Sequence, residues 1–265
     1  MAISVIIVTY NRAKMCRNLI HALMHQTKPP FEVIVIDDCP RTPPLNLEGA
    51  RVIKNQNELG LSRSKNLGIS MAKGDILLFL DDDLRVGPDL ISNIERYFSE
   101  DISLMGGLVV PFCLSPPPNW FDIRRLGWSL GVYNEEIIGS ILVVRRKILK
   151  KVGLFNPNLG RIGGSLLSWE DNDFVRRVRE AGYATLFEKN LVVEHFVPSS
   201  RLSLPYLMRR YWMEGISWKH VPHQSRTHSF LQSVIKFVPL FLFDRRRALP
   251  HLLNAIRISA YYLGS

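Results

Sequence analysis

Three consecutive carboxylates are the side chains of this sequence best suited to chemistry. Asp81, Asp82 and Asp83 directly follow the apolar run 76–80. Carboxylates packed at the end of a buried strand repel one another unless a cation neutralises them. Oxygen ligands suit Mg²⁺ or Mn²⁺, and either ion also binds phosphate oxygens. The cluster therefore predicts a divalent metal site, with an acidic turn that caps the next helix as the alternative.

A second group of carboxylates, Glu170, Asp171 and Asp173, follows Trp169. Carboxylates are favourable in the first turn of a helix because of the helix dipole, so helix capping is one interpretation. The other is that one carboxylate, placed near a metal-bound substrate, accepts the proton of an attacking hydroxyl. Trp169 offers a flat apolar face that suits a sugar ring, although a core position is equally typical of tryptophan.

His195 follows the mostly apolar run 191–194. A lone histidine in such a run is more typical of a core residue than of a ligand. It becomes a candidate metal ligand if its strand ends beside the aspartates, where a neutral imidazole can complete a metal shell.

The hydrophobic pattern predicts strands that alternate with helices. The predicted strands are Ile3–Val8, Phe31–Ile36, Arg51–Lys54, Ile76–Leu80, Gly139–Val144 and Thr185–His195, and the predicted helices are Ala13–Gln26, Ser62–Lys73, Pro88–Phe98, Arg146–Val152 and Trp169–Ala181. This alternation is typical of an α/β fold with a mostly parallel sheet, whose ligands collect at the carboxyl ends of the strands. Residues 111–135 are predicted to form an irregular loop over the site.

Size and composition suit one large α/β domain, or one domain with a helical appendage. The chain has 265 residues, 46% of them hydrophobic. Cys16, Cys39 and Cys113 lack metal-like spacing and predict reduced thiols in a reducing compartment such as the cytoplasm. The apolar stretch 3–8 is too short for a signal peptide, and no run reaches the roughly 18 apolar residues of a spanning helix.

Positive charge is concentrated in the C-terminal part. Residues 201–265 hold ten Lys or Arg against two carboxylates, which accounts for +8 of the net charge of +10. From Leu204 the pattern is helical, and the apolar stretch Phe230–Phe243 is followed by three arginines at 245–247. This pattern predicts a helix lying on the inner face of an anionic membrane, with helices packed on the main domain as the alternative.

Four motifs in order resemble family 2 glycosyltransferases, which have the Rossmann-like GT-A fold. The motifs are SVIIVTYNR at 4–12, VIVIDD at 33–38, NELGLSRSKNLG at 57–68 with KGDILLFLDDD at 73–83, and WEDND at 169–173. The resemblance covers residues 3–200. It implies a GT-A catalytic domain over residues 1–200, a basic helical extension over 201–265, and a nucleotide-sugar donor.

The resemblance also implies roles for the residues near the nucleotide. Tyr10 would lie against the base, Asp38 would accept a hydrogen bond from a base N–H, and Asp81 would approach the ribose. Asp82 is a further substrate-binding candidate. Lys65 stands where the family often has arginine, and we expect it to neutralise phosphate as a point charge.

The metal and the catalytic base follow from the same resemblance. Asp83 would bind Mn²⁺ or Mg²⁺ at the diphosphate, and His195 would also meet the metal. Asp171 would be the general base of an inverting displacement, with Trp169 and Glu170 among the substrate-binding residues. UDP-sugar is the favoured donor, and the acceptor is a saccharide or lipid-linked hydroxyl in surface polysaccharide or glycan biosynthesis.

Two other functions compete with this interpretation. A nucleotidyltransferase would carry a glycine-rich phosphate loop after the first strand, where this chain has Thr9, Tyr10, Asn11 and Arg12. A non-catalytic module that binds nucleic acid or membrane would use the basic C-terminal part. It would leave both acidic clusters without a purpose, so no nucleic-acid partner is expected.

Overall fold

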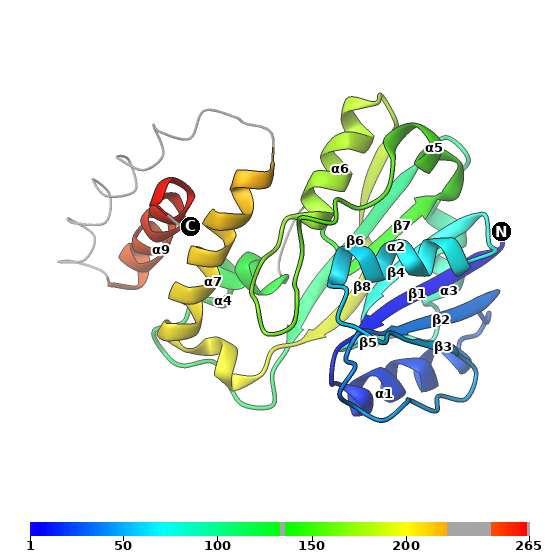
Figure 1. The fold of residues 1–265 in the computed structure, drawn as a ribbon, viewed down its shortest axis with the longest axis horizontal. Coiled ribbons are helices and arrows are strands. Elements are labelled where there is room, and N and C mark those ends of the chain that lie inside the picture. The colour runs from blue at the N-terminus through cyan, green and yellow to red at the C-terminus, as the bar shows by residue number, and fades with distance from the viewer. Residues whose placement is uncertain (133–135, 222–244, 264–265) are drawn as a thin grey trace.

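The protein is built around a single large sheet in a computed structural model that describes residues 1–132, 136–221 and 245–263 (Figure 1). The strands of these residues are β1 Ile3–Thr9, β2 Glu32–Asp37, β3 Arg51–Lys54, β4 Ile76–Asp81, β5 Leu84–Val86, β6 Leu104–Phe112, β7 Ile141–Arg145 and β8 Thr185–Phe196. Their order in the sheet is β3-β2-β1-β4-β7-β6-β8-β5. The predicted α/β class is confirmed.

Helices cover both faces of the sheet because its strands are apolar on both sides. Along β1, Val5 and Ile7 belong to one core cluster and Ile6 to the other. Helices α1 (Ala13–Met24) and α3 (Leu90–Tyr97) pack in the first cluster. Helices α2 (Leu61–Met71), α5 (Leu149–Val152) and α6 (Glu170–Glu180) pack in the second.

The sheet is mixed, with four parallel and three antiparallel strand pairings among the described strands, which agrees with the predicted mostly parallel sheet. β1 to β4 pair in parallel, as do β6 and β8, whereas β7 is antiparallel to β4 and β6, and β5 is antiparallel to β8. The sequence analysis missed β5 and β6. β5 is three residues long, and β6 contains Gly106, Gly107 and Pro111, which argue against a strand.

The two glycines of β6 are required by close packing. A Cβ on Gly106 would lie 2.7 Å from the Ile137 side chain, and one on Gly107 would lie 2.2 Å from the Leu191 carbonyl oxygen. The segment predicted as an irregular loop begins inside β6 and includes the short helices α4 (Ile123–Leu126) and η1 (Gly127–Leu130). Leu130 of η1 and the adjacent Gly131 line the cavity described in the next section.

The C-terminal part is helical where it is described. It comprises η3 (Ser199–Leu202), α7 (Leu204–Ser217), η4 (Trp218–His220) and α9 (Arg245–Leu263). Leu207 and Tyr211 of α7 are buried in the first core cluster. α7 and α9 cross closely, since a Cβ on Gly215 would lie 1.9 Å from the Arg257 carbonyl oxygen. Within the described ranges, no helix has the length and apolar character needed to span a bilayer, and the predicted interfacial stretch Phe230–Phe243 lies outside them.

Candidate active site

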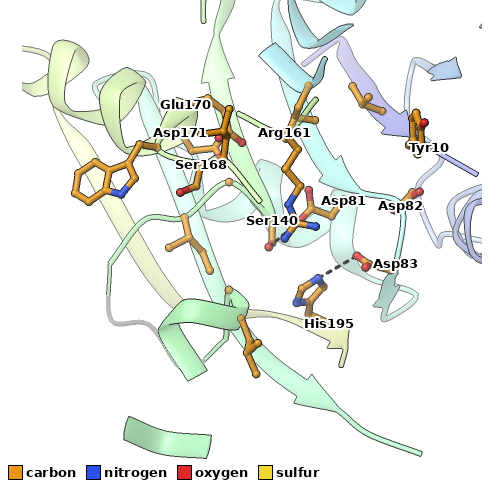
Figure 2. A pocket seen from close by; sticks show the side chains of 18 of the residues that line it. Tyr10, Asp81, Asp82, Asp83, Ser140, Arg161, Ser168, Glu170, Asp171 and His195 are labelled. Atoms are coloured by element: carbon orange, nitrogen blue, oxygen red, sulfur yellow. Dashed lines mark hydrogen bonds and ion pairs between the residues drawn. The ribbon is translucent and has the colours of Figure 1, made fainter. Parts of the chain in front are cut away.

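A cavity of about 480 Å³ opens at the carboxyl ends of β1, β2 and β4, a size typical of small-molecule sites. Every predicted site residue except Lys65 lines it, namely Tyr10, Asp38, Asp81, Asp82, Asp83, Trp169, Glu170, Asp171 and His195. Figure 2 labels all of these residues except Asp38 and Trp169 and shows them converging from separate elements. The predicted meeting of both acidic clusters in one place is therefore observed.

Asp81, Asp83 and His195 form a group that could hold a metal ion. One ligand atom from each lies within 4.8 Å of the others, and His195 Nε2 is 3.0 Å from Asp83 Oδ1 (Figure 2). Two carboxylates and one imidazole suit Mn²⁺. Among the described residues, the buried Asp83 Oδ1 has no hydrogen-bond donor besides the His195 ring, and the buried His195 Nδ1 has no partner. The residues present thus fit a bound cation.

The pairing of β5 with β8 brings His195 to the aspartates. Leu84, directly after Asp83, is the register partner of His195, and the Phe196 N–H donates to the Asp83 carbonyl oxygen at 3.0 Å. Asp81 is fixed from the other side because Ser140 Oγ donates to its Oδ2 at 2.8 Å. The condition under which His195 was expected to be a ligand is met.

Arg12 and Thr9 compensate the charge of this acidic turn. Arg12 pairs with Asp83 Oδ2 and lies 3.2 Å from Asp82 Oδ1, while Thr9 Oγ1 donates to Asp82 Oδ2 at 2.6 Å. Burial raises the pKa of Asp82 to about 7 against the attraction of Arg12. Burial would also raise the pKa of Asp83, but His195 and Arg12 more than offset it and hold that pKa below its usual range.

Tyr10 and Asp38 lie where β1 and β2 end, on the side expected for the nucleotide. Asp38 is buried and already accepts from the backbone N–H of Leu59 at 2.9 Å and of Gly60 at 2.8 Å. It therefore fixes the turn into α2 as well as lining the cavity. The Tyr10 hydroxyl donates to Glu58 Oε2 at 3.2 Å.

Lys65 lies behind the second acidic cluster rather than at a phosphate. Its Nζ is 2.5 Å from Asp171 Oδ1 and 3.3 Å from Glu170 Oε1, and the side chain is almost fully buried. It is not among the residues lining the cavity, so its expected contact with phosphate finds no support in the structure. The reason is tertiary: the Lys65 side chain extends from α2 to the start of α6, where two buried carboxylates require a cation.

The Lys65 ion pairs set the proton affinity of Asp171. Burial and the neighbouring Glu170 raise the pKa of Asp171 to about 8, against the opposing effect of Lys65. Burial also penalises the charge of Glu170, but Lys65 outweighs this and lowers its pKa. A carboxylate with a raised pKa beside the cavity is suited to accept a proton near neutral pH.

Gly139 provides the space that Asp171 occupies. A Cβ on Gly139 would lie 1.5 Å from Asp171 Oδ2 and 2.0 Å from its Cγ. Lys65 holds Oδ1, so the carboxylate is fixed between the lysine and the Gly139 backbone. Only glycine at position 139 is compatible with this orientation.

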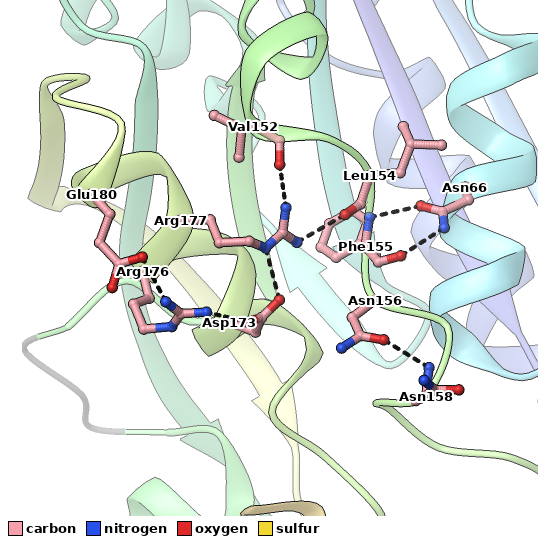
Figure 3. A network of polar contacts seen from close by, with 10 residues as sticks. All are labelled: Asn66, Val152, Leu154, Phe155, Asn156, Asn158, Asp173, Arg176, Arg177 and Glu180. Atoms are coloured by element: carbon pink, nitrogen blue, oxygen red, sulfur yellow. Dashed lines mark hydrogen bonds and ion pairs between the residues drawn. The ribbon is translucent and has the colours of Figure 1, made fainter. Parts of the chain in front are cut away.

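Asp173, the third carboxylate of the segment, anchors α6. It accepts from Arg176 at 2.7 Å and from Arg177 at 2.8 Å, and Arg177 also donates to the carbonyl oxygens of Val152 and Leu154 (Figure 3). These contacts tie the first turn of α6 to the segment after α5. Asp173 thus has a structural role, whereas Glu170 and Asp171 line the cavity.

The turn before α6 has an unusual backbone. Trp169 has φ +79° and Asn11 has φ +54°, and they are the non-glycine residues with positive φ in the described part of the chain. Trp169 lines the cavity and Asn11 stands between two residues that line it, consistent with the clustering of strained residues at functional sites. The Trp169 indole N–H donates to Glu214 of α7 at 3.2 Å, which attaches α7 to the site.

The sequence analysis missed the cationic residues of the cavity. Arg12, Arg161, Arg201 and Arg210 all line it, together with Gly139. The signal for Arg161 was a glycine-rich stretch, GRIGG at 160–164, directly before the second acidic segment. Arg201 and Arg210 had no local signal, because they were counted only as part of the basic C-terminal region.

Comparison with known proteins agrees with this arrangement. The model of glycosyl transferase family 2 matches residues 4–153, more than half of the chain. The chain belongs to this family. The glucosyl-dolichyl phosphate glucuronosyltransferase of Haloferax volcanii is 25% identical over 239 residues, which cover 82% of this chain and 76% of that protein. Glycosyltransferase AglE of the same organism is 24% identical over 208 residues, 73% of this chain and 66% of that protein.

Solved structures share the fold of this family 2 glycosyltransferase. A mannosyltransferase from Pyrobaculum calidifontis in complex with GDP-Man and Mn²⁺ has a TM-score of 0.59 at 16% identity, over 100% of this chain and 76% of that one. GalNAc-T7 with UDP, GalNAc and Mn²⁺ has a TM-score of 0.57 at 17% identity, over 98% and 54%. The predicted family, GT-A fold and enzyme class are confirmed, and the nucleotidyltransferase and binding-module alternatives are set aside.

Proposed function

We propose that this glycosyltransferase inverts the anomeric centre of a nucleotide-diphosphate sugar by direct transfer to an acceptor hydroxyl. The observation that carries the proposal is the common cavity of the Asp81, Asp83 and His195 group and Asp171. The group would hold Mn²⁺ or Mg²⁺, and when bound such an ion supplies Lewis-acid stabilisation of a departing diphosphate.

In this proposal Asp171 is the general base. Its Oδ1 is held by Lys65, and its Oδ2 lies over Gly139. An acceptor hydroxyl that approaches this carboxylate would pass its proton to it as the oxygen attacks the anomeric carbon. Glu170 shares Lys65 and has the lowered pKa, so it stays ionised and favours proton uptake by Asp171.

The donor and acceptor are proposed at the level of chemical class. Tyr10 and Asp38 would contact the base of the nucleotide. Asp82 would stabilise the acidic turn that carries Asp81 and Asp83, and Trp169 would lie beside the donor and acceptor sugars. UDP is the favoured nucleotide, although the similar solved structures hold GDP-Man in one case and UDP in the other. The Haloferax volcanii relative named for glucosyl-dolichyl phosphate supports a lipid-linked saccharide acceptor in glycan or surface polysaccharide synthesis.

A panel of UDP- and GDP-sugars tests the proposal. Thermal stabilisation and slow donor hydrolysis are measured with Mn²⁺, with Mg²⁺ and with EDTA. We expect one nucleotide class to stabilise the protein only when metal is present, and Asp171→Asn to keep that stabilisation while transfer falls about 10²- to 10⁴-fold. Metal-independent binding of every donor, or normal transfer by the Asp171 variant, would contradict the assignment.

We further propose that the enzyme acts in the cytoplasm on the inner membrane surface. The excess of ten basic over two acidic residues in 201–265 supports attraction to anionic lipid. A flotation assay with two kinds of vesicle tests this: one of phosphatidylcholine alone and one that also contains about 30 mol% phosphatidylglycerol. Equal recovery on both vesicle types would refute it.

A further inference from the structure

One face of α7 carries exposed apolar side chains. Leu204, Met208 and Trp212 are 40%, 42% and 37% exposed. They follow one another at intervals of four residues, so they form a single row along the helix. We refer to these three residues as the α7 stripe. Single exposed apolar residues are ordinary, but a row of large ones is typical of a surface that binds a partner.

The α7 stripe lies on the opposite side of the helix from the cavity. Arg210 and Glu214 of α7 line the cavity. They come two positions after Met208 and Trp212, which corresponds to a rotation of about 200° around the helix axis. Tyr211 of the same helix is buried in the first core cluster. α7 is therefore a wall of the cavity, and the outer side of this wall is apolar.

The loop before α6 is attached to α7 and adds a further exposed apolar side chain. Arg209 Nη2 donates to the Gly164 carbonyl oxygen at 3.3 Å, and Figure 1 shows the loop beside α7. Ile162 of this loop is exposed, and its neighbours Arg161 and Gly163 line the cavity. The exposed apolar residues thus lie on two connected segments that both border the cavity.

The C-terminal part that carries the stripe is positively charged. Residues 199–221 and 245–263 contain eight Lys or Arg and one carboxylate, Glu214. Glu214 is buried, and its Oε1 lies 3.4 Å from Arg257. Arg209 of α7 and Lys219 of η4 are exposed. An apolar row with exposed cations and no exposed carboxylate on its helix is complementary to an anionic lipid surface, whereas a second copy of the chain would bring like charges together.

We propose that the α7 stripe and Ile162 form the surface by which this enzyme docks on an anionic membrane. The indole of Trp212 suits this position, because tryptophan is favourable at the boundary between lipid headgroups and acyl chains. Arg209 and Lys219 would lie among the lipid phosphates. The inference rests on the membrane association in the proposed function and identifies the surface that would carry it.

Docking through this surface would set the distance between the cavity and the lipid. Since α7 separates the two, the cavity would lie about one helix diameter, roughly 10–12 Å, from the membrane surface. A lipid-linked acceptor would keep its hydrocarbon chain in the bilayer while its sugars extend to Asp171. The docking surface would thereby bring the enzyme and such an acceptor together in a fixed orientation.

Flotation of the full chain with vesicles of phosphatidylcholine and about 30 mol% phosphatidylglycerol tests the inference. The test variant combines Met208→Ser with Trp212→Ser. The matched control combines Leu154→Ser with Phe31→Ser, which also removes one aliphatic and one aromatic side chain, 47% and 59% exposed in other parts of the molecule. We expect the test variant to bind these vesicles about 10- to 100-fold more weakly than the parent, and the control to bind them within about twofold of the parent.

Three outcomes would overturn the inference. The first is equal flotation of the parent and the test variant, and the second is an equal loss in the control. The third is a dimer of the parent in sedimentation without lipid that Trp212→Ser dissociates, because the stripe would then bind a second copy. If the test variant does not fold, Leu204→Ser decides by the same comparison.

Failure of the proposed function gives different results. A parent that does not float on the anionic vesicles refutes the membrane association as a whole, and the docking surface with it. Glycosyl transfer is judged separately, because metal-dependent nucleotide binding is measured without vesicles. We expect the test variant and the control to keep that binding, since none of the four substituted residues lines the cavity.

Discussion

Gly139→Ala is the substitution that most directly tests the placement of the base. The added Cβ would lie 1.5 Å from Asp171 Oδ2, 2.0 Å from Cγ and 2.6 Å from Oδ1. Non-bonded heavy atoms prefer separations of about 3.5 Å, so the carboxylate must move by roughly 2 Å. Lys65, 2.5 Å from Oδ1, opposes that movement. A misplacement of about 1 Å costs about 100-fold in rate, so we expect kcat to fall at least about 100-fold.

The assay separates a moved base from a damaged fold. Transfer is followed at saturating donor and acceptor, alongside the melting temperature and the affinity for nucleotide with Mn²⁺. Gly87→Ala is the matched control, because nothing lies within 4 Å of a Cβ built there. We expect both variants to fold and to bind nucleotide, with only Gly139→Ala losing turnover. A folded Gly139→Ala enzyme with kcat within threefold of the parent would refute the role of Asp171.

Three further outcomes follow from the structure. The turnover number should rise with pH through about 8 and level off above it, because the base must be ionised and burial raises the pKa of Asp171 to that value. Lys65→Met removes the cation that opposes this rise in pKa, so the increase in turnover should occur at higher pH. Asp83→Ala should abolish the metal-dependent part of nucleotide binding in a thermal-shift titration with Mn²⁺, and retention of that part would place the metal elsewhere. Asp173→Ala should lower the free energy of unfolding in urea by about 2 kcal/mol through two lost charged hydrogen bonds, whereas Glu180→Ala at the exposed end of the same network should change it by less than about 0.5 kcal/mol.

Local pattern was sufficient for most elements around the site. The apolar runs that became β1, β2 and β4 were predicted to within a residue or two, because strands buried on both faces have an uninterrupted apolar signal. Elements whose residues are required by contacts with distant parts of the chain had a weaker local signal in the sequence. β6 was missed because Gly106 and Gly107 are needed where Ile137 and Leu191 approach, and the same glycines weaken a strand pattern.

The site residues also fall into those that the local sequence indicated and those that only the folded chain revealed. The two acidic clusters were predicted from their own sequence context, since carboxylates after a buried strand or at a helix start carry a local signal, and the family resemblance singled out Asp83 and Asp171 within them. Lys65 was expected at a phosphate, but in the folded chain its side chain extends from α2 to Asp171 at the start of α6. Gly139 gave no local sign that it borders that carboxylate.

The sequence alone thus determined the family, the strands that end at the cavity, and the carboxylates available there. Tertiary structure decided which side chains meet: antiparallel pairing of β5 with β8 brings His195 to Asp83, and α7 brings Arg210 to the cavity. The physical reason is the separation along the chain over which each kind of interaction acts. Hydrophobic periodicity and helix signals act over a few residues, whereas strand partners and helix packing depend on segments far apart in the chain.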